Sequence, residues 1–139
     1  MKATTFFRFA LLLPILLPLL LLPFKLEMVS ALLLLSLGFG GVQYIFFAAV
    51  AFLWLGRIKS IAGQIKLLWL SPLLFIPFQV LGWLIYFQVE RLSNPNLTGG
   101  GSALLPMVVY SLLIGYFYVL IVYFVFVQIQ KLRLLFTKQ

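Results

Sequence analysis

Four long apolar runs divide the chain, and short clusters of polar and charged residues separate them. The runs cover residues 6–24, 28–55, 67–88 and 103–128. A helix of about 20 apolar residues crosses the roughly 30 Å of hydrocarbon in a bilayer, so each run is long enough to span a membrane. The pattern predicts an all-α, polytopic membrane protein in which residues 1–139 form a single transmembrane domain, an antiparallel four-helix bundle with no soluble domain.

Basic residues are unevenly distributed among the segments that join these runs. If successive runs cross the membrane in opposite directions, Lys25 and Arg91 fall on one side and eight basic residues fall on the other. Lysine- and arginine-rich segments stay in the cytoplasm, so we expect both termini to be cytoplasmic, in a plasma or inner membrane. The eight residues are Lys2, Arg8, Arg57, Lys59, Lys66, Lys131, Arg133 and Lys138.

Two basic segments on the predicted cytoplasmic side have apolar residues at helical spacing, which favours contact with the membrane surface. Residues 56–66 fit a short interfacial helix, and the tail 131–139 repeats the pattern. A basic side chain near anionic headgroups gains about 1 kcal/mol. The residues expected to make this contact are Arg57, Lys59, Lys66, Lys131, Arg133 and Lys138.

The composition supports a membrane protein, and it changes the partner that the positive net charge indicates. Hydrophobic residues make up 65% of the chain and charged residues 9%, and the formal net charge is +8. In a soluble protein this charge would suggest nucleic acid, but no soluble basic domain is predicted here to hold a phosphate backbone. The partner that we expect is the lipid bilayer with its anionic headgroups, and no nucleic acid.

The first apolar run contains Pro14, Pro18 and Pro23. Proline removes a backbone N–H and leaves a carbonyl without its helical partner, so we expect a kinked helix. A freed carbonyl is costly in lipid, which indicates that one side of this helix packs on protein. The alternative is a broken helix that binds a solute at its open carbonyls.

The same run resembles a secretory signal in having basic residues before an apolar segment. Val29-Ser30-Ala31 has the small residues of a cleavage site, but Lys25 and Glu27 interrupt the apolar run before it. The run is also long for a signal, and another apolar run follows directly. We therefore expect an uncleaved membrane helix.

Small residues mark one face of the second run and part of the fourth. Ser36, Gly40 and Ala48 fall on one arc at helical spacing, and Ser111 and Gly115 repeat the small-xxx-small form. Such faces let helices approach closely. Packing within the chain is the favoured interpretation, and a face kept for a partner subunit is the alternative.

Four polar residues are expected to form a layer near the membrane midplane: Gln43, Tyr44, Gln79 and Tyr116. Gln43 and Gln79 are predicted to lie at similar depth and to hydrogen-bond each other. A satisfied polar contact in a packed bundle is the favoured interpretation, and a path for a small solute or ion is the alternative. The centres of the runs hold no ionisable residue other than tyrosine, which disfavours coupled transport.

The chain is poorly supplied with groups for catalysis or metal binding. It contains no cysteine or histidine, and its only carboxylates are Glu27 and Glu90, each within two positions of a basic residue. We expect no catalytic residues, no metal site, no cofactor and no enzymatic activity.

The function expected from these features is that of a non-enzymatic accessory, structural or assembly subunit of a larger membrane complex. The alternative is a homo-oligomeric channel, transporter or pore former for a small solute or ion. The expected protein partners are accordingly other membrane subunits or further copies of the chain. An outward-facing polar stripe would favour the oligomer, whereas an outward aromatic and apolar surface would favour the accessory role. No motif is specific enough to name a family.

Overall fold

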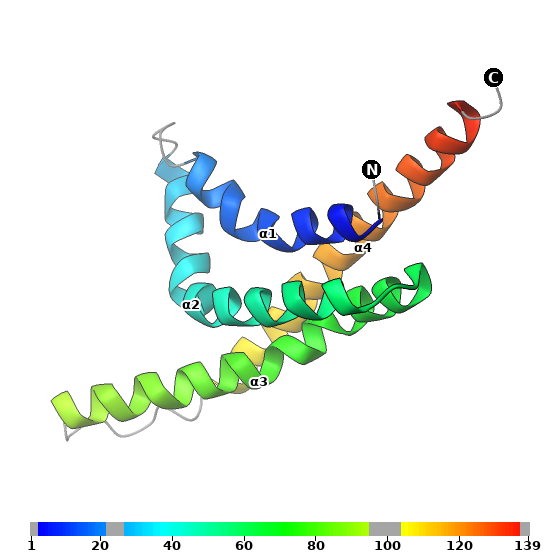
Figure 1. Ribbon diagram of the computed structural model, residues 1–139. Coiled ribbons are helices and arrows are strands. Elements are labelled where there is room, and N and C mark those ends of the chain that lie inside the picture. Colours follow the sequence, from blue (N-terminus) through cyan, green and yellow to red (C-terminus); the bar gives the residue numbers. More distant parts are fainter. Residues whose placement is uncertain (1–2, 22–26, 95–103, 137–139) are drawn as a thin grey trace.

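Four helices make up the part of the chain that the structure, a computed structural model, describes. It describes residues 3–21, 27–94 and 104–136, with side chains except those of 17–21, 27–40 and 133–136. The all-helical prediction is confirmed. The helices are α1 (Ala3–Leu21), α2 (Glu27–Arg57), α3 (Ile61–Ser93) and α4 (Leu104–Phe136) (Figure 1).

Two of these helices are long and apolar enough to cross a membrane. α3 and α4 each contain 33 residues, which corresponds to a length of about 50 Å at 1.5 Å per residue. Only 11% and 17% of their most apolar windows are buried, so they differ from the core helices of a soluble protein. In α1 and α2, the apolar stretches with described side chains, Ala3–Leu16 and Gly41–Arg57, are shorter.

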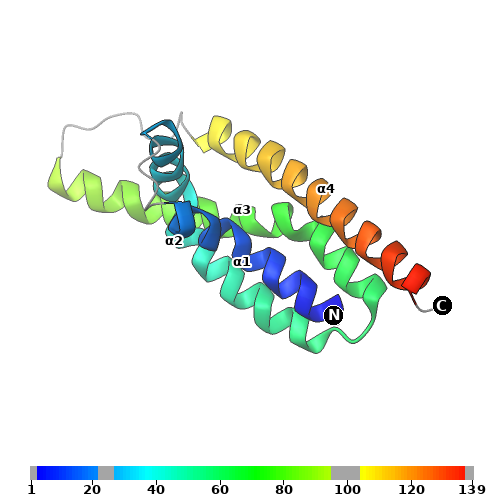
Figure 2. The same ribbon diagram turned by 90° about the horizontal axis from the view of Figure 1, so that it is seen from above.

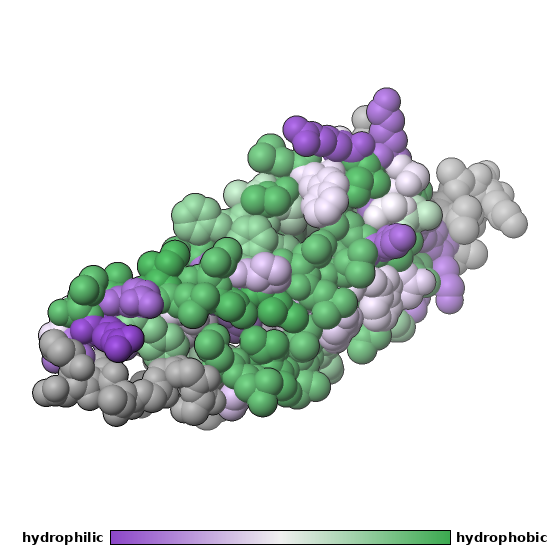
Figure 3. Space-filling model, turned by 90° about the horizontal axis from the view of Figure 1, so that it is seen from below, coloured by the Kyte–Doolittle hydropathy of each residue, from purple (hydrophilic) through white to green (hydrophobic). Residues whose placement is uncertain are grey.

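The helices pack mainly on their neighbours in the sequence: α1 on α2, α2 on α3 and α3 on α4. Figures 1 and 2 show the start of α1, the end of α2, the start of α3 and the end of α4 gathered toward one end of the molecule. The other four helix ends lie toward the opposite end. On the face drawn in Figure 3, mostly apolar side chains lie between polar side chains toward the two ends.

The connection between α2 and α3 is short and well capped. Ser60 is the N-cap of α3: its side-chain oxygen accepts from the N–H of Gly63 at 3.2 Å, and its carbonyl accepts from the N–H of Gln64 at 3.1 Å. Residues 56–66 therefore do not form the separate interfacial helix that the apolar spacing suggested. They are divided between the end of α2 and the first turns of α3.

A hydrophobic core lies toward the end of the molecule that holds the connection between α2 and α3. The Phe7 ring of α1 lies 4.7 Å from the Phe126 ring of α4, measured between centroids, so α4 also packs against α1. The buried residues of this core come from all four helices: Phe7, Ala10, Leu55, Leu67, Val122 and Phe126. This core joins all four helices at that end of the bundle.

Candidate functional site

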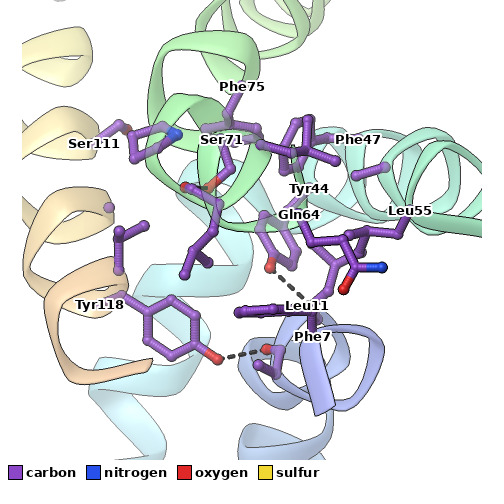
Figure 4. Close-up of a pocket in the computed structure, with 17 residues that line it drawn as sticks. Phe7, Leu11, Tyr44, Phe47, Leu55, Gln64, Ser71, Phe75, Ser111 and Tyr118 are labelled. Atoms are coloured by element: carbon purple, nitrogen blue, oxygen red, sulfur yellow. Dashed lines mark hydrogen bonds between the residues drawn. The ribbon is translucent and has the colours of Figure 1, made fainter. Parts of the chain in front are cut away.

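Two tyrosines bind main-chain oxygens of α1 one turn before Pro14. Proline lacks an N–H, so the carbonyl of Ala10 cannot make its usual bond to residue 14. The hydroxyl of Tyr118 on α4 donates to this oxygen, and the hydroxyl of Tyr44 on α2 donates to the carbonyl of Leu11 at 2.9 Å. Figure 4 shows the two rings reaching α1 from different helices. The freed carbonyl at Pro14 is thus satisfied by protein, as we expect of this helix from its sequence.

A second proline, Pro72 in α3, is accommodated locally. Its missing N–H frees the carbonyl of Leu68, and the hydroxyl of Ser71 donates to that oxygen at 2.6 Å. The two prolines are thus each matched by a hydroxyl in the interior of the bundle, that of Tyr118 for Pro14 and that of Ser71 for Pro72. The kink expected of α1 remains a prediction; Pro23 and the side chain of Pro18 lie outside the described residues.

These hydroxyls line a cavity between the four helices. Its volume is about 90 Å³, and apolar side chains form most of its wall. Figure 4 shows the residues around it. Each helix contributes: Phe7 and Leu11 from α1, Tyr44 and Phe47 from α2, Gln64 and Ser71 from α3, and Ser111 and Tyr118 from α4.

The predicted hydrogen bond between Gln43 and Gln79 is not formed. The amide nitrogen of Gln79 donates to the hydroxyl oxygen of Ser111 at 2.6 Å, and the Gln79 side chain is 2% exposed. Gln43 lies instead against Gly82, where a Cβ atom would collide with it. The two amides are on facing helices, but rotation of α3 turns Gln79 toward α4 rather than toward α2.

Of the four residues predicted for the midplane layer, only Tyr44 lines the cavity. Gln79 is connected to it through Ser111, Gln43 lies at the contact between α2 and α3, and Tyr116 is half-buried away from the wall. The tyrosine of α4 that reaches the interior is Tyr118. Pro14 indicates in the sequence that the carbonyl of Ala10 needs another hydrogen-bond donor. It does not indicate which tyrosine is that donor.

Gln64 is not among the residues that the sequence predicts for the interior, yet its side chain is 2% exposed. Its amide nitrogen donates to the hydroxyl of Thr4 at 2.8 Å and to the carbonyl of Ile58 at 2.9 Å, so it joins α1 to the connection between α2 and α3. Its Oε1 atom is buried and has no hydrogen-bond partner. The available signal was its position three residues before the apolar Leu67, but the segment 56–66 is expected from the sequence to lie at the membrane surface rather than in the bundle.

The small residues with described side chains lie inside the bundle. Ala48 is 2% exposed, and a Cβ atom on Gly115 would lie 3.0 Å from the Cβ of Pro72. Gly115 thus lets α4 approach the ring of Pro72 closely. Ser111, one turn earlier, accepts the bond from Gln79. The side chains of Ser36 and Gly40 lie outside the described residues.

The basic residues with described side chains differ in their surroundings. Arg57, Lys59, Lys66 and Lys131 are exposed. Arg8 is half-buried, and its guanidinium lies 4.3 Å from the centre of the Phe52 ring, within the range of a cation–π interaction. The side chains of Arg133 and Lys138 are not described.

The interior site offers hydrogen bonds without formal charge. Among the described residues there is no group of three or more histidine, cysteine, aspartate or glutamate side chains that would hold a metal ion. The residues that line the cavity are apolar, hydroxyl-bearing or amides. This arrangement suits the binding of small polar groups and the fixing of helix positions. Comparison with protein-family models, with curated proteins and with solved structures finds no match to this chain.

Proposed function

We propose that this protein is a non-enzymatic subunit of a larger membrane complex, with an accessory, structural or assembly role. All four helices cross the membrane in this proposal, with both termini in the cytoplasm. The gathering of the basic residues 57, 59, 66 and 131 near one group of helix ends supports this orientation. The opposite group of helix ends includes Arg91 and Glu90.

The observation that carries the proposal is that four polar side chains of the bundle turn inward, whereas the exposed Tyr86, Gln88 and Tyr110 lie nearer the helix ends. Gln64 and Gln79 are buried, and the hydroxyls of Tyr44 and Tyr118 donate hydrogen bonds to carbonyls of α1. By contrast, an exposed apolar and aromatic stripe runs along α4, at spacings of three and four residues. Its members are Leu105, Val109, Leu113, Phe117, Leu120 and Phe124.

This distribution favours a partner of different sequence over a self-assembled pore. A pore between copies of the chain needs polar side chains on the outer surface of each monomer, because water or an ion must pass along them. The stripe on α4 offers instead aliphatic and aromatic surface, which suits contact with lipid and with apolar transmembrane helices. Phe117, near its middle, is 66% exposed.

Photo-crosslinking in the native membrane, combined with purification, tests this proposal. A photoreactive phenylalanine analogue replaces Phe117 on α4 in one variant and Phe46, 65% exposed on α2, in a second. The tagged protein is then purified in nanodiscs and analysed by mass spectrometry. We expect one other membrane protein in stoichiometric amount, crosslinked to position 117 and not to position 46.

Recovery of the chain with only its own copies would contradict the accessory role. The second candidate function, a channel or transporter for a small solute or ion, would then be tested by flux into liposomes. The interior cavity is the observation that favours this candidate. Gln43→Leu and Gln79→Leu are the first substitutions to measure, because both remove amides from the interior without adding charge.

A further inference from the structure

We propose that the start of α1 and the end of α2 form a binding site for the phosphate group of an anionic phospholipid, with the guanidinium of Arg8 as its main ligand. These two helix ends lie side by side, at the end of the molecule that holds the connection between α2 and α3 (Figure 2). The inference rests on the membrane location of the helices. It goes beyond the proposed function, because it concerns a lipid rather than a protein partner.

The guanidinium of Arg8 has a defined place on α2. It lies 4.3 Å from the centre of the Phe52 ring, and Gly56 follows Phe52 by one turn on the same side of the helix. A Cβ atom at Gly56 would lie 2.5 Å from the Nη2 atom of Arg8, so the absence of a side chain there makes room for the guanidinium. Because Gly56 is exposed, this nitrogen lies beside the outer surface of the bundle.

The positive charge of Arg8 has no side-chain carboxylate near it. The chain contains only Glu27, which is the first residue of α2, and Glu90, which is near the end of α3, and both lie toward the opposite group of helix ends. Arg57 and Lys59, which are exposed, add positive charge at the end of α2. A half-buried cation at the edge of the hydrocarbon is costly without a counter-charge, and a bound anion supplies one.

Two features indicate that this anion is the phosphate of a lipid. A guanidinium presents its N–H groups as a planar fork, which binds two oxygens of one phosphate. Exposed apolar side chains flank the site: Phe9 is 58% exposed, Leu53 69% and Trp54 48%. In a bilayer they contact acyl chains, and tryptophan is typical of the headgroup level. A phosphate ion from water would gain nothing from this apolar surface, whereas a phospholipid uses both parts.

Native mass spectrometry of the full chain, with one lipid added at a time, tests the proposal. The probes are phosphatidylglycerol and phosphatidylcholine with identical acyl chains. Both carry a phosphate, but only the first has a net negative charge. The principal variant is Gly56→Ala, because its methyl group displaces the guanidinium of Arg8 while the charge of the chain and the helix are kept. Arg8→Gln removes the guanidinium, and Lys131→Gln removes one charge at an exposed position of α4.

We expect the wild-type chain to bind phosphatidylglycerol at least about fivefold more tightly than phosphatidylcholine, because the charge-assisted bonds of the guanidinium are not opposed by a choline cation. Gly56→Ala and Arg8→Gln should each remove most of this preference, whereas Lys131→Gln should keep it. Arg8→Lys should retain only part of it, since an ammonium group lacks the planar fork.

Equal binding of the two lipids by the wild-type chain would overturn the proposal. A loss of preference in Lys131→Gln as large as that in Arg8→Gln would also overturn it, because it would show a general attraction to positive charge. Inorganic phosphate in large excess should leave the bound lipid in place, and release of the lipid would show a site for free phosphate instead.

The test does not depend on one variant or on the accessory role. If Arg8→Gln does not fold, Gly56→Ala still decides, because it displaces only the flexible end of the Arg8 side chain. Lipid binding is measured on the isolated chain, so its failure would leave the crosslinking result at position 117 unchanged.

Discussion

Pro14 and Pro72 show how a hydroxyl group can bind the carbonyl that a proline leaves without its helical partner. Ala10 and Leu68 are the residues four positions before Pro14 and Pro72, and each carbonyl accepts a bond from a hydroxyl. The donor to Leu68 is its neighbour Ser71, whereas the donor to Ala10 is Tyr118 on another helix. Only the second bond also fixes the position of one helix against another.

The bond from Tyr118 can be measured by a double-mutant cycle with Pro14. Tyr118→Phe should lower the free energy of unfolding by about 1–2 kcal/mol, because it leaves the carbonyl of Ala10 without a donor. In the Pro14→Ala background the cost should fall close to zero, since residue 14 regains the N–H that binds Ala10. Unfolding in mixed detergent micelles measures both values.

Tyr110→Phe is the matched control for this cycle, because Tyr110 lies on the same helix and is 60% exposed. Its effect should be small and equal in both backgrounds. A cost of Tyr118→Phe that does not depend on residue 14 would show that the hydroxyl acts through some other contact.

The sequence predicts that a tyrosine of the fourth helix reaches the interior of the bundle, but it does not predict which one. Tyr116 and Tyr118 are two residues apart, a rotation of about 200° around the helix, so they face nearly opposite sides. α4 is apolar around most of its circumference, and its pattern therefore does not specify the inward side. The same ambiguity explains why the sequence predicts a hydrogen bond from Gln79 to Gln43 and not the one that it makes to Ser111.

Among the elements, the contact between α3 and α4 depends on one glycine. Gly115 lies against the ring of Pro72, which cannot move aside as a flexible side chain can. Gly115→Leu should force the helices apart and lower the free energy of unfolding by about 1–3 kcal/mol. Thermal unfolding in nanodiscs measures the change.

Ala49→Leu is the control for Gly115→Leu, because Ala49 is exposed on α2 and has room for the larger side chain. Stability should be nearly unchanged in that variant. Equal stability of the two variants would show that α3 and α4 tolerate a wider separation than the position of Gly115 indicates.

The existence of the helices is the part of the fold that the sequence predicts best, because long apolar runs leave few alternatives in lipid. Their ends are harder to predict. Polar residues such as Gln64 and Lys66 are good helix formers, so α3 begins right after Ser60 rather than at the first residue of the apolar run. The fold thus gains one of its buried amides, Gln64, from a segment that the sequence predicts as a surface-lying interfacial helix.

For the whole molecule, the proposed orientation places positions 59 and 131 on one side of the membrane and position 91 on the other. All three residues are exposed and the natural chain has no cysteine, so Lys59→Cys, Lys131→Cys and Arg91→Cys give clean single labels. A membrane-impermeant maleimide should react in intact cells only at position 91. Permeabilised cells should react at all three.

Labelling of position 91 together with 59 and 131 in intact cells would contradict the crossing of α3. Labelling of 59 and 131 alone in intact cells would reverse the orientation and keep the crossing. The labelling therefore tests two predictions separately: that α3 crosses the membrane, and that the basic residues lie on the cytoplasmic side. From the sequence, each of these predictions depends on the other.

The bond between Tyr118 and Ala10 joins residues 108 positions apart, and this separation has a consequence for biosynthesis. The ribosome synthesises α1 before α4. The carbonyl of Ala10 therefore has no Tyr118 donor in the nascent chain until α4 has been made. If all four helices cross the membrane as proposed, a chain truncated before α4 keeps this open carbonyl in the hydrocarbon, together with the core surface that Val122 and Phe126 cover. The hydrogen bonding of α1 is thus completed only after α4 has been made, so the stability of the first helix depends on a helix that is synthesised much later.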